Sequence, residues 1–282
     1  MKSTEPITIV GSNLSAVWAR AFLHVLHAGH SDCLIVAIRD FEGGLPPQDG
    51  QIAAALDQAL RDANTHTINQ TALTLIPYES WLRKDKPDLR ALSDWYLNRL
   101  LPRLKARCAL NRRVTYFERL IAYTGVRTVS GRPEIGQVNQ LEYVVSLWRR
   151  GAENGRRPRQ SALQLACFDP VKDDTGSALA GFPCLQQISI TYREAGTLEL
   201  NAYYPTQYMF ERAYGNYLGL CQLGHFLAHE MGLRFSALTC FVARPERGKQ
   251  SKVSHAALVR ILRRRLSVIT PGSHDEEPAL SR

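Results

Sequence analysis

The segment from Phe182 to Leu233 constrains the fold of this 282-residue chain more than any other stretch. Two runs rich in Ile, Leu, Thr and Tyr, Gln187 to Thr191 and Leu198 to Tyr203, are typical of β-strands. They are joined by Glu194-Ala195-Gly196, a short turn-like stretch that contains glycine. Because two such runs around a glycine turn favour antiparallel pairing, the sequence predicts a β-hairpin.

A long helix is predicted directly after the hairpin. Leucines and a methionine recur there at helical spacing, at Leu220, Leu223, Leu227 and Met231. The remaining positions are largely apolar too, which is typical of a helix buried on all sides: Tyr217, Leu218, Cys221 and Phe226. Gly219 and Gly224 indicate close packing against a neighbour, and Gly232 marks the C-terminus of the helix.

Two residues frame these elements: Cys184, preceded by Pro183 and placed just before the first strand, and Asn216 near the start of the helix. This order resembles the thymidylate synthase superfamily, in which Pro-Cys supplies the nucleophile, a hairpin follows, and an Asn opens the buried helix. Cys184-Leu185-Gln186 is most similar to the archaeal and pyrimidine hydroxymethylase branch. The resemblance extends over residues 10 to 248 and includes Asn139-Gln140-Leu141 and Phe168-Asp169-Pro170.

The resemblance implies an α+β fold of the thymidylate synthase type. A mostly antiparallel sheet would pack against the long buried helix, and the other face of the sheet would form the interface of a homodimer. One domain is expected over residues 1–270, since no long Pro/Gly/Ser linker divides the chain. Residues 271–282 contain Pro, Gly, Ser and successive acids without apolar periodicity, so a disordered tail is expected.

Cys184 is the predicted catalytic residue. A thiolate attacks electron-poor carbon, and nearby positive charge raises the reactive fraction. The resemblance implies that Cys184 adds to C6 of a pyrimidine and so makes C5 nucleophilic toward a one-carbon unit. The alternative is a small buried strand cysteine that reacts with nothing.

Asn216 is the predicted reader of the base. Its amide offers both a donor and an acceptor, and the resemblance implies that it contacts the uracil edge. In the cytosine-acting members of the family an Asp often replaces this Asn, so Asn216 favours uracil. The alternative is an ordinary helix N-cap, a position that Asn also favours.

The chain departs from the family after the second hairpin strand. Where the family has Arg-Ser-x-Asp, for phosphate and folate, this chain has Pro205, Thr206, Gln207 and Tyr208. Gln207 is the residue of this stretch that we include among the substrate-binding residues. The resemblance implies 5,10-methylenetetrahydrofolate as cofactor, but Tyr208 cannot carry the charge of the family's Asp near neutral pH. The expected ribose-binding His-x-Tyr is likewise absent, since Glu246-Arg247-Gly248 stand there.

Arginines are available to replace the missing phosphate ligands. The candidates lie where the family keeps its phosphate arginines or one turn beyond Tyr208: Arg127, Arg156, Arg157, Arg159 and Arg212. Each alone is also typical of a solvated surface. The formal net charge of +9 favours acidic partners, including nucleotides, and leaves nucleic acid open, although no recognition motif accompanies the charge.

Two functions follow from these residues. The first is an enzyme that methylates or hydroxymethylates C5 of a pyrimidine nucleotide or nucleoside. The second is a non-catalytic relative that kept the fold and binds a nucleotide or a protein. A dinucleotide-binding oxidoreductase would rest only on the turn at Gly11-Ser12-Asn13, which has Asn where the second glycine is needed.

Other patterns bear on location and metals. The sequence contains no run of about 18 apolar residues, so no membrane span is predicted. The N-terminus lacks a signal-peptide pattern, and a cytoplasmic protein is therefore expected. The order of His225, His229 and Glu230 places the acid outside the histidine pair, so no metal site is predicted there. Thr71 to Pro77 is predicted to be a strand, and Leu92 to Ala109 a helix with a kink at Pro102.

Overall fold

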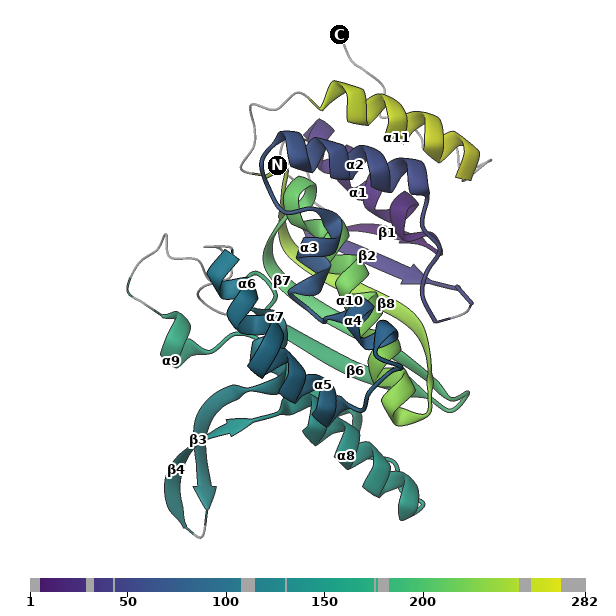
Figure 1. Ribbon diagram of the computed structural model, residues 1–282. Coiled ribbons are helices and arrows are strands. Elements are labelled where there is room, and N and C mark those ends of the chain that lie inside the picture. Colours follow the sequence, from purple (N-terminus) through teal and green to yellow (C-terminus); the bar gives the residue numbers. More distant parts are fainter. Residues whose placement is uncertain are drawn as a thin grey trace.

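The computed structural model describes residues 6–28, 33–42, 44–107, 115–129, 131–174, 176, 183–248 and 255–269. A six-stranded sheet forms its centre, in the order β1-β2-β8-β7-β6-β5 (Figure 1). Its strands are β1 (Ile7–Gly11), β2 (Leu34–Arg39), β5 (Gln164–Ala166), β6 (Gln187–Arg193), β7 (Thr197–Tyr208) and β8 (Arg234–Glu246). Three neighbouring pairs are antiparallel and two, β1-β2 and β7-β8, are parallel. The α+β class is therefore observed with a mixed sheet.

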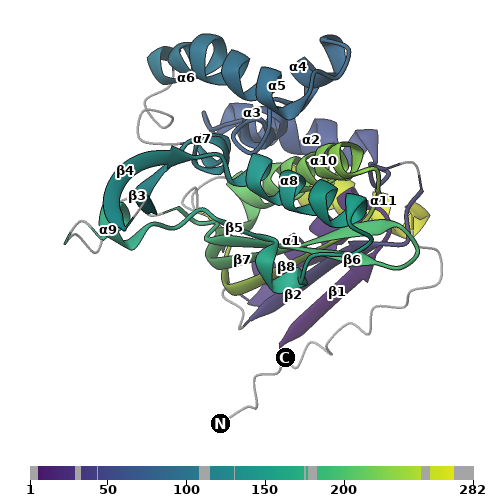
Figure 2. The same ribbon diagram turned by 90° about the horizontal axis from the view of Figure 1, so that it is seen from below.

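Helices lie over one face of this sheet (Figure 2). Helix α10 (Tyr214–Met231) packs on β7 and β8, and α1 (Leu14–Ala28) packs on β1, β2 and α10. The other helices are α2 (Gly50–Asp62), α3 (Ile68–Leu73), α4 (Tyr78–Arg83), α5 (Leu89–Trp95), α6 (Leu101–Arg107), α7 (Tyr116–Ile121), α8 (Gln140–Glu153), α9 (Pro170–Asp173) and α11 (Ala256–Ile269). One continuous apolar core runs from Ile9 in β1 to Leu262 in α11. No described helix is long and apolar enough to cross a membrane.

Helix α10 is the predicted buried helix, and nearly all of its side chains are shielded from solvent. The two glycines permit close contacts: a Cβ on Gly219 would lie 2.9 Å from the carbonyl oxygen of Ala72, and one on Gly224 would clash with the ring of Phe235. Gly232 ends the helix in the left-handed conformation at φ 66°. All three expectations about glycine are confirmed.

The predicted hairpin is formed by β6 and β7, which pair in register from Gln187↔Tyr203 to Arg193↔Thr197. Its turn lies at residues 194–196, and Gly196 has φ 73°. Along β7, Leu198, Leu200 and Ala202 are buried while Tyr203 is exposed, which is the alternation of a sheet covered on one face.

Of two sequence predictions about the helical layer, the strand is wrong and the helix is confirmed over residues 92–107. Residues 71–77 do not form a strand, because Thr67 and Gln70 form a reciprocal capping box that starts α3. The helix expected from Leu92 to Ala109 consists of α5, a π-helical segment (Tyr96–Leu100) and α6, and the observed part ends at Arg107. Because α6 continues directly from the π-helical segment, Pro102 lies inside a continuous helical run, just after the point where the hydrogen-bond pattern changes.

A two-stranded hairpin projects from the body beside α8 (Figure 1). It is formed by β3 (Tyr123–Val129) and β4 (Arg132–Val138), paired antiparallel. Val126 and Ile135 pair across it and are both exposed. The predicted tail beyond Pro271 lies outside the described residues.

Candidate functional site

Cys184 lies in a short segment that enters β6, and backbone hydrogen bonds fix the residues that follow it. The N–H of Leu185 donates to the hydroxyl oxygen of Tyr116 at 3.2 Å, and the N–H of Gln186 donates to the carbonyl of Tyr203 at 3.0 Å. The carbonyl of Gln186 accepts from Cys167 N–H at 2.8 Å. Cys184 itself is half-buried and packs against the core. A rigid, partly accessible thiol is what a nucleophilic cysteine needs.

Two tyrosines lie within electrostatic range of this thiol. Burial raises the pKa of Tyr116, the first residue of α7, and the neighbouring Cys184 raises it further. At the end of β7, the pKa of Tyr208 is raised first by burial and then by Glu246 and Cys184. Both hydroxyl groups therefore stay protonated near neutral pH.

Arg212 is the predicted phosphate ligand that the structure brings to this region. It lies in a π-helical segment (Met209–Ala213), a type of turn that often occurs at functional sites. Its guanidinium donates to Nδ1 of His66 at 2.9 Å and acts electrostatically on Tyr116. Burial and then Arg212 lower the pKa of His66, so its imidazole is neutral and accepts this bond.

Asn216 is the third residue of α10 and is only 3% exposed. It does not cap the helix, because the π-helical segment continues directly into α10 and Ala213 already has helical dihedral angles. Its side chain makes no hydrogen bond with the described residues. The N-cap interpretation is thus wrong, and the amide retains both its donor and its acceptor.

Gln207 is a core residue, exposed by only 1%. Its Oε1 accepts from the hydroxyl of Tyr217 at 2.8 Å, whereas its buried Nε2 has no partner in the described structure. The buried hydroxyl of Tyr204 also lacks a partner, and its neighbours include Tyr116 and Tyr217. Buried polar groups are nearly always satisfied, so these two atoms are exceptions in the described core.

The other predicted arginines are not brought to Cys184 within one chain. Arg156 and Arg157 line a cleft of about 500 Å³ with Arg150 and Pro158. Arg157 stacks on Trp148 and on Tyr192, 5.3 and 5.5 Å from the ring centres. Tyr192 is five residues along β6 from Gln187, which corresponds to about 17 Å in a strand.

Arg159 and Arg127 are separate from that cleft. Arg159 is exposed and precedes a single turn of 3-10 helix, Gln160–Ala162. Arg127 belongs to the projecting β3–β4 hairpin, opposite Glu134, and its side chain lies outside the described residues. Neither position adds to the group around Cys184.

A buried ion pair that the sequence did not reveal supports the site. Arg119 binds Asp173 with both terminal nitrogens, at 2.7 and 2.6 Å, and also donates to the carbonyl of Cys167. Such bidentate contacts are strong and directional. They tie α7, which carries Tyr116, to α9 and to the strand end beside Gln186.

The two segments that the resemblance aligns with folate and ribose ligands lie side by side. Strand β7 pairs with β8 up to Thr206↔Arg244, Gln207↔Pro245 and Tyr208↔Glu246. Tyr208 supplies a neutral hydroxyl where the family has a carboxylate, and Glu246 is held by Arg244 at 2.9 Å. The residues present therefore do not fit the folate group in the family's manner.

The turn after β1 does not offer a phosphate site. Strands β1 and β2 are parallel and joined by α1, as a dinucleotide fold requires. However, the first N–H groups of α1 are already used: Leu14 donates to the carbonyl of Pro47, and Ala16 donates to Oδ1 of Asn13. An added dinucleotide would have to displace both.

The histidines of α10 contact aromatic side chains. Nδ1 of His225 and the hydroxyl of Tyr78 are hydrogen-bonded at 2.6 Å, and His229 packs edge-on against Trp81. No group of three or more potential metal ligands occurs in the described part of the chain.

No protein-family model matches the chain, and comparison with curated proteins finds no match either.

Proposed function

We propose that the chain is an enzyme of the thymidylate synthase type that acts at C5 of a uracil nucleotide or nucleoside. One observation carries the proposal: Cys184 is half-buried beside a backbone N–H that Tyr116 holds, and Tyr116 and Tyr208 both lie in electrostatic range of its thiol, while Arg212 acts on Tyr116. A nucleophile just before β6 and two tyrosines from α7 and β7 thus lie close together, with the cation of Arg212 near one of the tyrosines. This is the constellation expected for covalent catalysis on a polar ring.

The chemistry begins with addition of the Cys184 thiolate to C6 of the pyrimidine. The C5–C6 electron pair moves toward C5 and the C4 oxygen, giving an enolate whose C5 is nucleophilic. Tyrosine hydroxyls and the amide of Asn216 are suited to stabilise the negative oxygen by hydrogen bonds. After C5 has gained its new substituent it loses its original proton, and departure of the thiolate restores the double bond.

The one-carbon donor is a separate matter. Methylenetetrahydrofolate follows from the resemblance alone, and Tyr208 does not provide the carboxylate that the family uses for it. The proposal therefore extends to attack by C5 on a one-carbon electrophile at the oxidation level of formaldehyde, which leaves a hydroxymethyl group, and it includes no step on folate.

A homodimer through the open face of the sheet is part of this proposal. Tyr203 of β7 and Phe241 of β8 pair across the strands, stack at 5.7 Å and are 38% and 41% exposed. Ile35 of β2 lies next to Phe241 in the same row. Exposed aromatic residues clustered on an uncovered sheet are typical of protein interfaces.

A second candidate is a non-catalytic nucleotide- or protein-binding relative. Pro205 and Tyr208 replace family ligands, and Arg156 and Arg157 lie at the far end of β6 from Cys184. These departures favour loss of turnover with retention of the fold.

Differential alkylation separates the two candidates. Iodoacetamide should modify Cys184 faster than Cys167, Cys221 and Cys240, which are fully buried. Uridine nucleotides should slow this modification, as read by peptide mass spectrometry, because a base stacked over the sulfur excludes the reagent. An unreactive Cys184 that nucleotides do not protect would refute the enzyme.

A further inference from the structure

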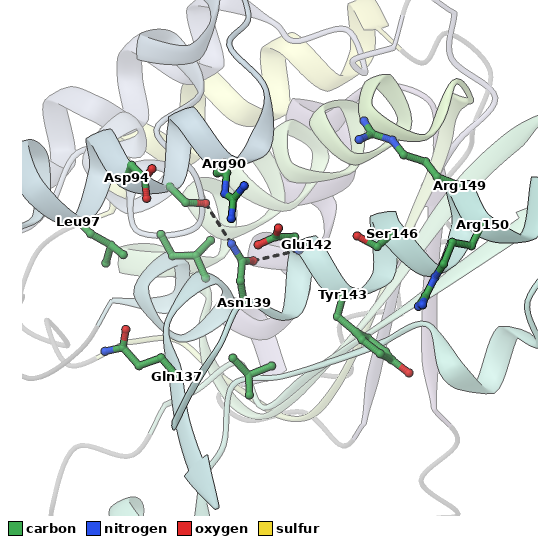
Figure 3. A pocket seen from close by; sticks show the side chains of 13 residues that line it. Arg90, Asp94, Leu97, Gln137, Asn139, Glu142, Tyr143, Ser146, Arg149 and Arg150 are labelled. Atoms are coloured by element: carbon green, nitrogen blue, oxygen red, sulfur yellow. Dashed lines mark hydrogen bonds between the residues drawn. The ribbon is translucent and has the colours of Figure 1, made fainter. Parts of the chain in front are cut away.

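A second cleft, with a volume of about 810 Å³, lies between α5 and α8 (Figure 3). Apolar side chains of Leu97, Ile121 and Val138 line part of it. Arg90 and Asp94 of α5 and Glu142 of α8 contribute charges to its walls. None of the residues around Cys184 takes part in the cleft. The cleft has the size of a small-molecule site, and most of its lining is polar or charged around a small apolar part.

The two walls of the cleft are held together by a fixed contact. Asn139 caps α8 by accepting from the N–H of Glu142 at 2.9 Å, and its Nδ2 donates to the hydroxyl of Ser93 at 3.3 Å (Figure 3). The Ser93 hydroxyl in turn donates to the carbonyl of Leu89 at 2.7 Å within α5. The first turn of α8 is therefore connected to α5, so the separation of the walls is set before any ligand binds.

The charges in the cleft are not used by the protein itself. Among the described residues, Arg90, Asp94 and Glu142 form no ion pair, although all three point toward the same part of the cleft in Figure 3. Arg149, farther along α8, differs because its guanidinium is bound to Glu230 at 2.9 Å. At this part of the cleft Arg90 thus faces two unpaired carboxylates, while Arg150, a second lining arginine without an ion pair among the described residues, lies at the other end in Figure 3.

We propose that this cleft binds a small zwitterion, an amino acid with an apolar side chain. The guanidinium of Arg90 would hold the carboxylate with two parallel N–H bonds. Asp94 and Glu142 would hold the ammonium group, and Ile121 and Val138 would contact the apolar side chain. A phosphate is disfavoured at Arg90 because Asp94 and Glu142 lie beside it and repel an anion.

Derivatives that remove one charge at a time test the assignment. Leucine and phenylalanine are titrated into the full-length protein by calorimetry, next to their N-acetyl forms and their methyl esters. We expect saturable binding of at least one amino acid, and binding at least about tenfold weaker for both derivatives, a loss of about 1.4 kcal/mol. No saturable binding of either amino acid up to about 10 mM would overturn the proposal.

Matched variants test which side chain binds the carboxylate of the ligand and which binds its ammonium group. Arg90→Gln should abolish the preference for the free acid over the ester, and Glu142→Gln the preference for the free amine over the acetylated form. Arg83→Gln and Glu79→Gln, which change exposed residues of α4 outside the cleft, should leave binding unchanged. Equal effects of the cleft and control variants would also overturn the proposal. The test involves neither Cys184 nor a nucleotide, so its outcome is independent of the proposed function.

Discussion

The hydroxyl oxygen of Tyr116 accepts a hydrogen bond from the backbone N–H of Leu185 at 3.2 Å, across 69 positions of sequence. It therefore anchors the residue that follows Cys184. Tyr116→Phe removes this acceptor and should destabilise the fold by about 1 kcal/mol.

The same variant should also change the rate at which Cys184 is alkylated, because the segment carrying the thiol loses its anchor. Urea titration and alkylation kinetics measure the two effects. Tyr143→Phe, which changes an exposed residue of α8, is the control. An unchanged alkylation rate in Tyr116→Phe would show that this tyrosine does not position Cys184.

Gly219→Ala should destabilise the protein. The added methyl group would lie 2.9 Å from the carbonyl oxygen and 3.0 Å from the Cα of Ala72, and backbone cannot yield as a side chain does. Overpacking of about 1–3 kcal/mol outweighs the helix-propensity gain of about 1 kcal/mol. Gly50→Ala, with nothing within 4 Å of the new atom, should be neutral or stabilising. The melting temperatures of both variants test this prediction. A higher melting temperature for Gly219→Ala than for the wild type would contradict the packing described for α10.

Stability should fall as the pH drops below about 6.5. Burial is the main cause that lowers the pKa of His24, His66, His225 and His255, so the unfolded chain binds more protons than the folded one in this range. The free energy of unfolding therefore rises with pH through that window.

His255→Phe tests one of these residues. The ring of His255 already packs against Phe22 and Phe210, and Phe keeps these contacts without titrating. Arg247 also lowers its pKa, and Glu211 opposes that effect. Denaturant titrations between pH 7.5 and 5.5 measure how the free energy of unfolding changes with pH. We expect a smaller change for His255→Phe than for the control His229→Gln, which alters an exposed residue. Identical slopes would show that His255 does not titrate on unfolding.

Charge on the open sheet face should dissociate the proposed dimer. Tyr203→Lys or Phe241→Lys places a cation into a row of apolar side chains on both copies, which costs binding through desolvation and repulsion. Sedimentation should show a dimer for the wild type and a monomer for either variant, while Tyr143→Lys stays dimeric. A monomeric wild type at micromolar concentration would contradict the dimer.

The hairpin, the buried helix and its glycines could be predicted because each rests on a local pattern. The apolar content of residues 71–77 favours a strand. The capping box of Thr67 and Gln70 before them starts a helix instead. The π-helical segment carrying Arg212 has no sequence signature, so the register that brings Arg212 near Tyr116 was not foreseeable.

The candidate site was only partly predictable. Cys184, Asn216 and Arg212 are predicted from their order along the chain, whereas Tyr116 and Arg119 give no such signal because their contacts are made across distant segments. Arg156 and Arg157 were grouped with Cys184 by sequence order alone, and the length of β6 separates them within one chain. An aromatic residue at the first turn of a short helix gives no signal of a role.

Exchange of the C5 hydrogen of a uracil nucleotide tests the central claim most directly, because it needs the thiol but no one-carbon donor. Addition of Cys184 to C6 lets C5 take up a deuteron from D₂O, lose its original proton and release the enzyme. We expect deuterium at C5 by proton NMR with the wild-type protein, none with Cys184→Ala, and unchanged exchange with Cys33→Ala. Absence of exchange with the wild-type protein for uridine nucleotides and uridine alike, or equal exchange with Cys184→Ala, would contradict the account.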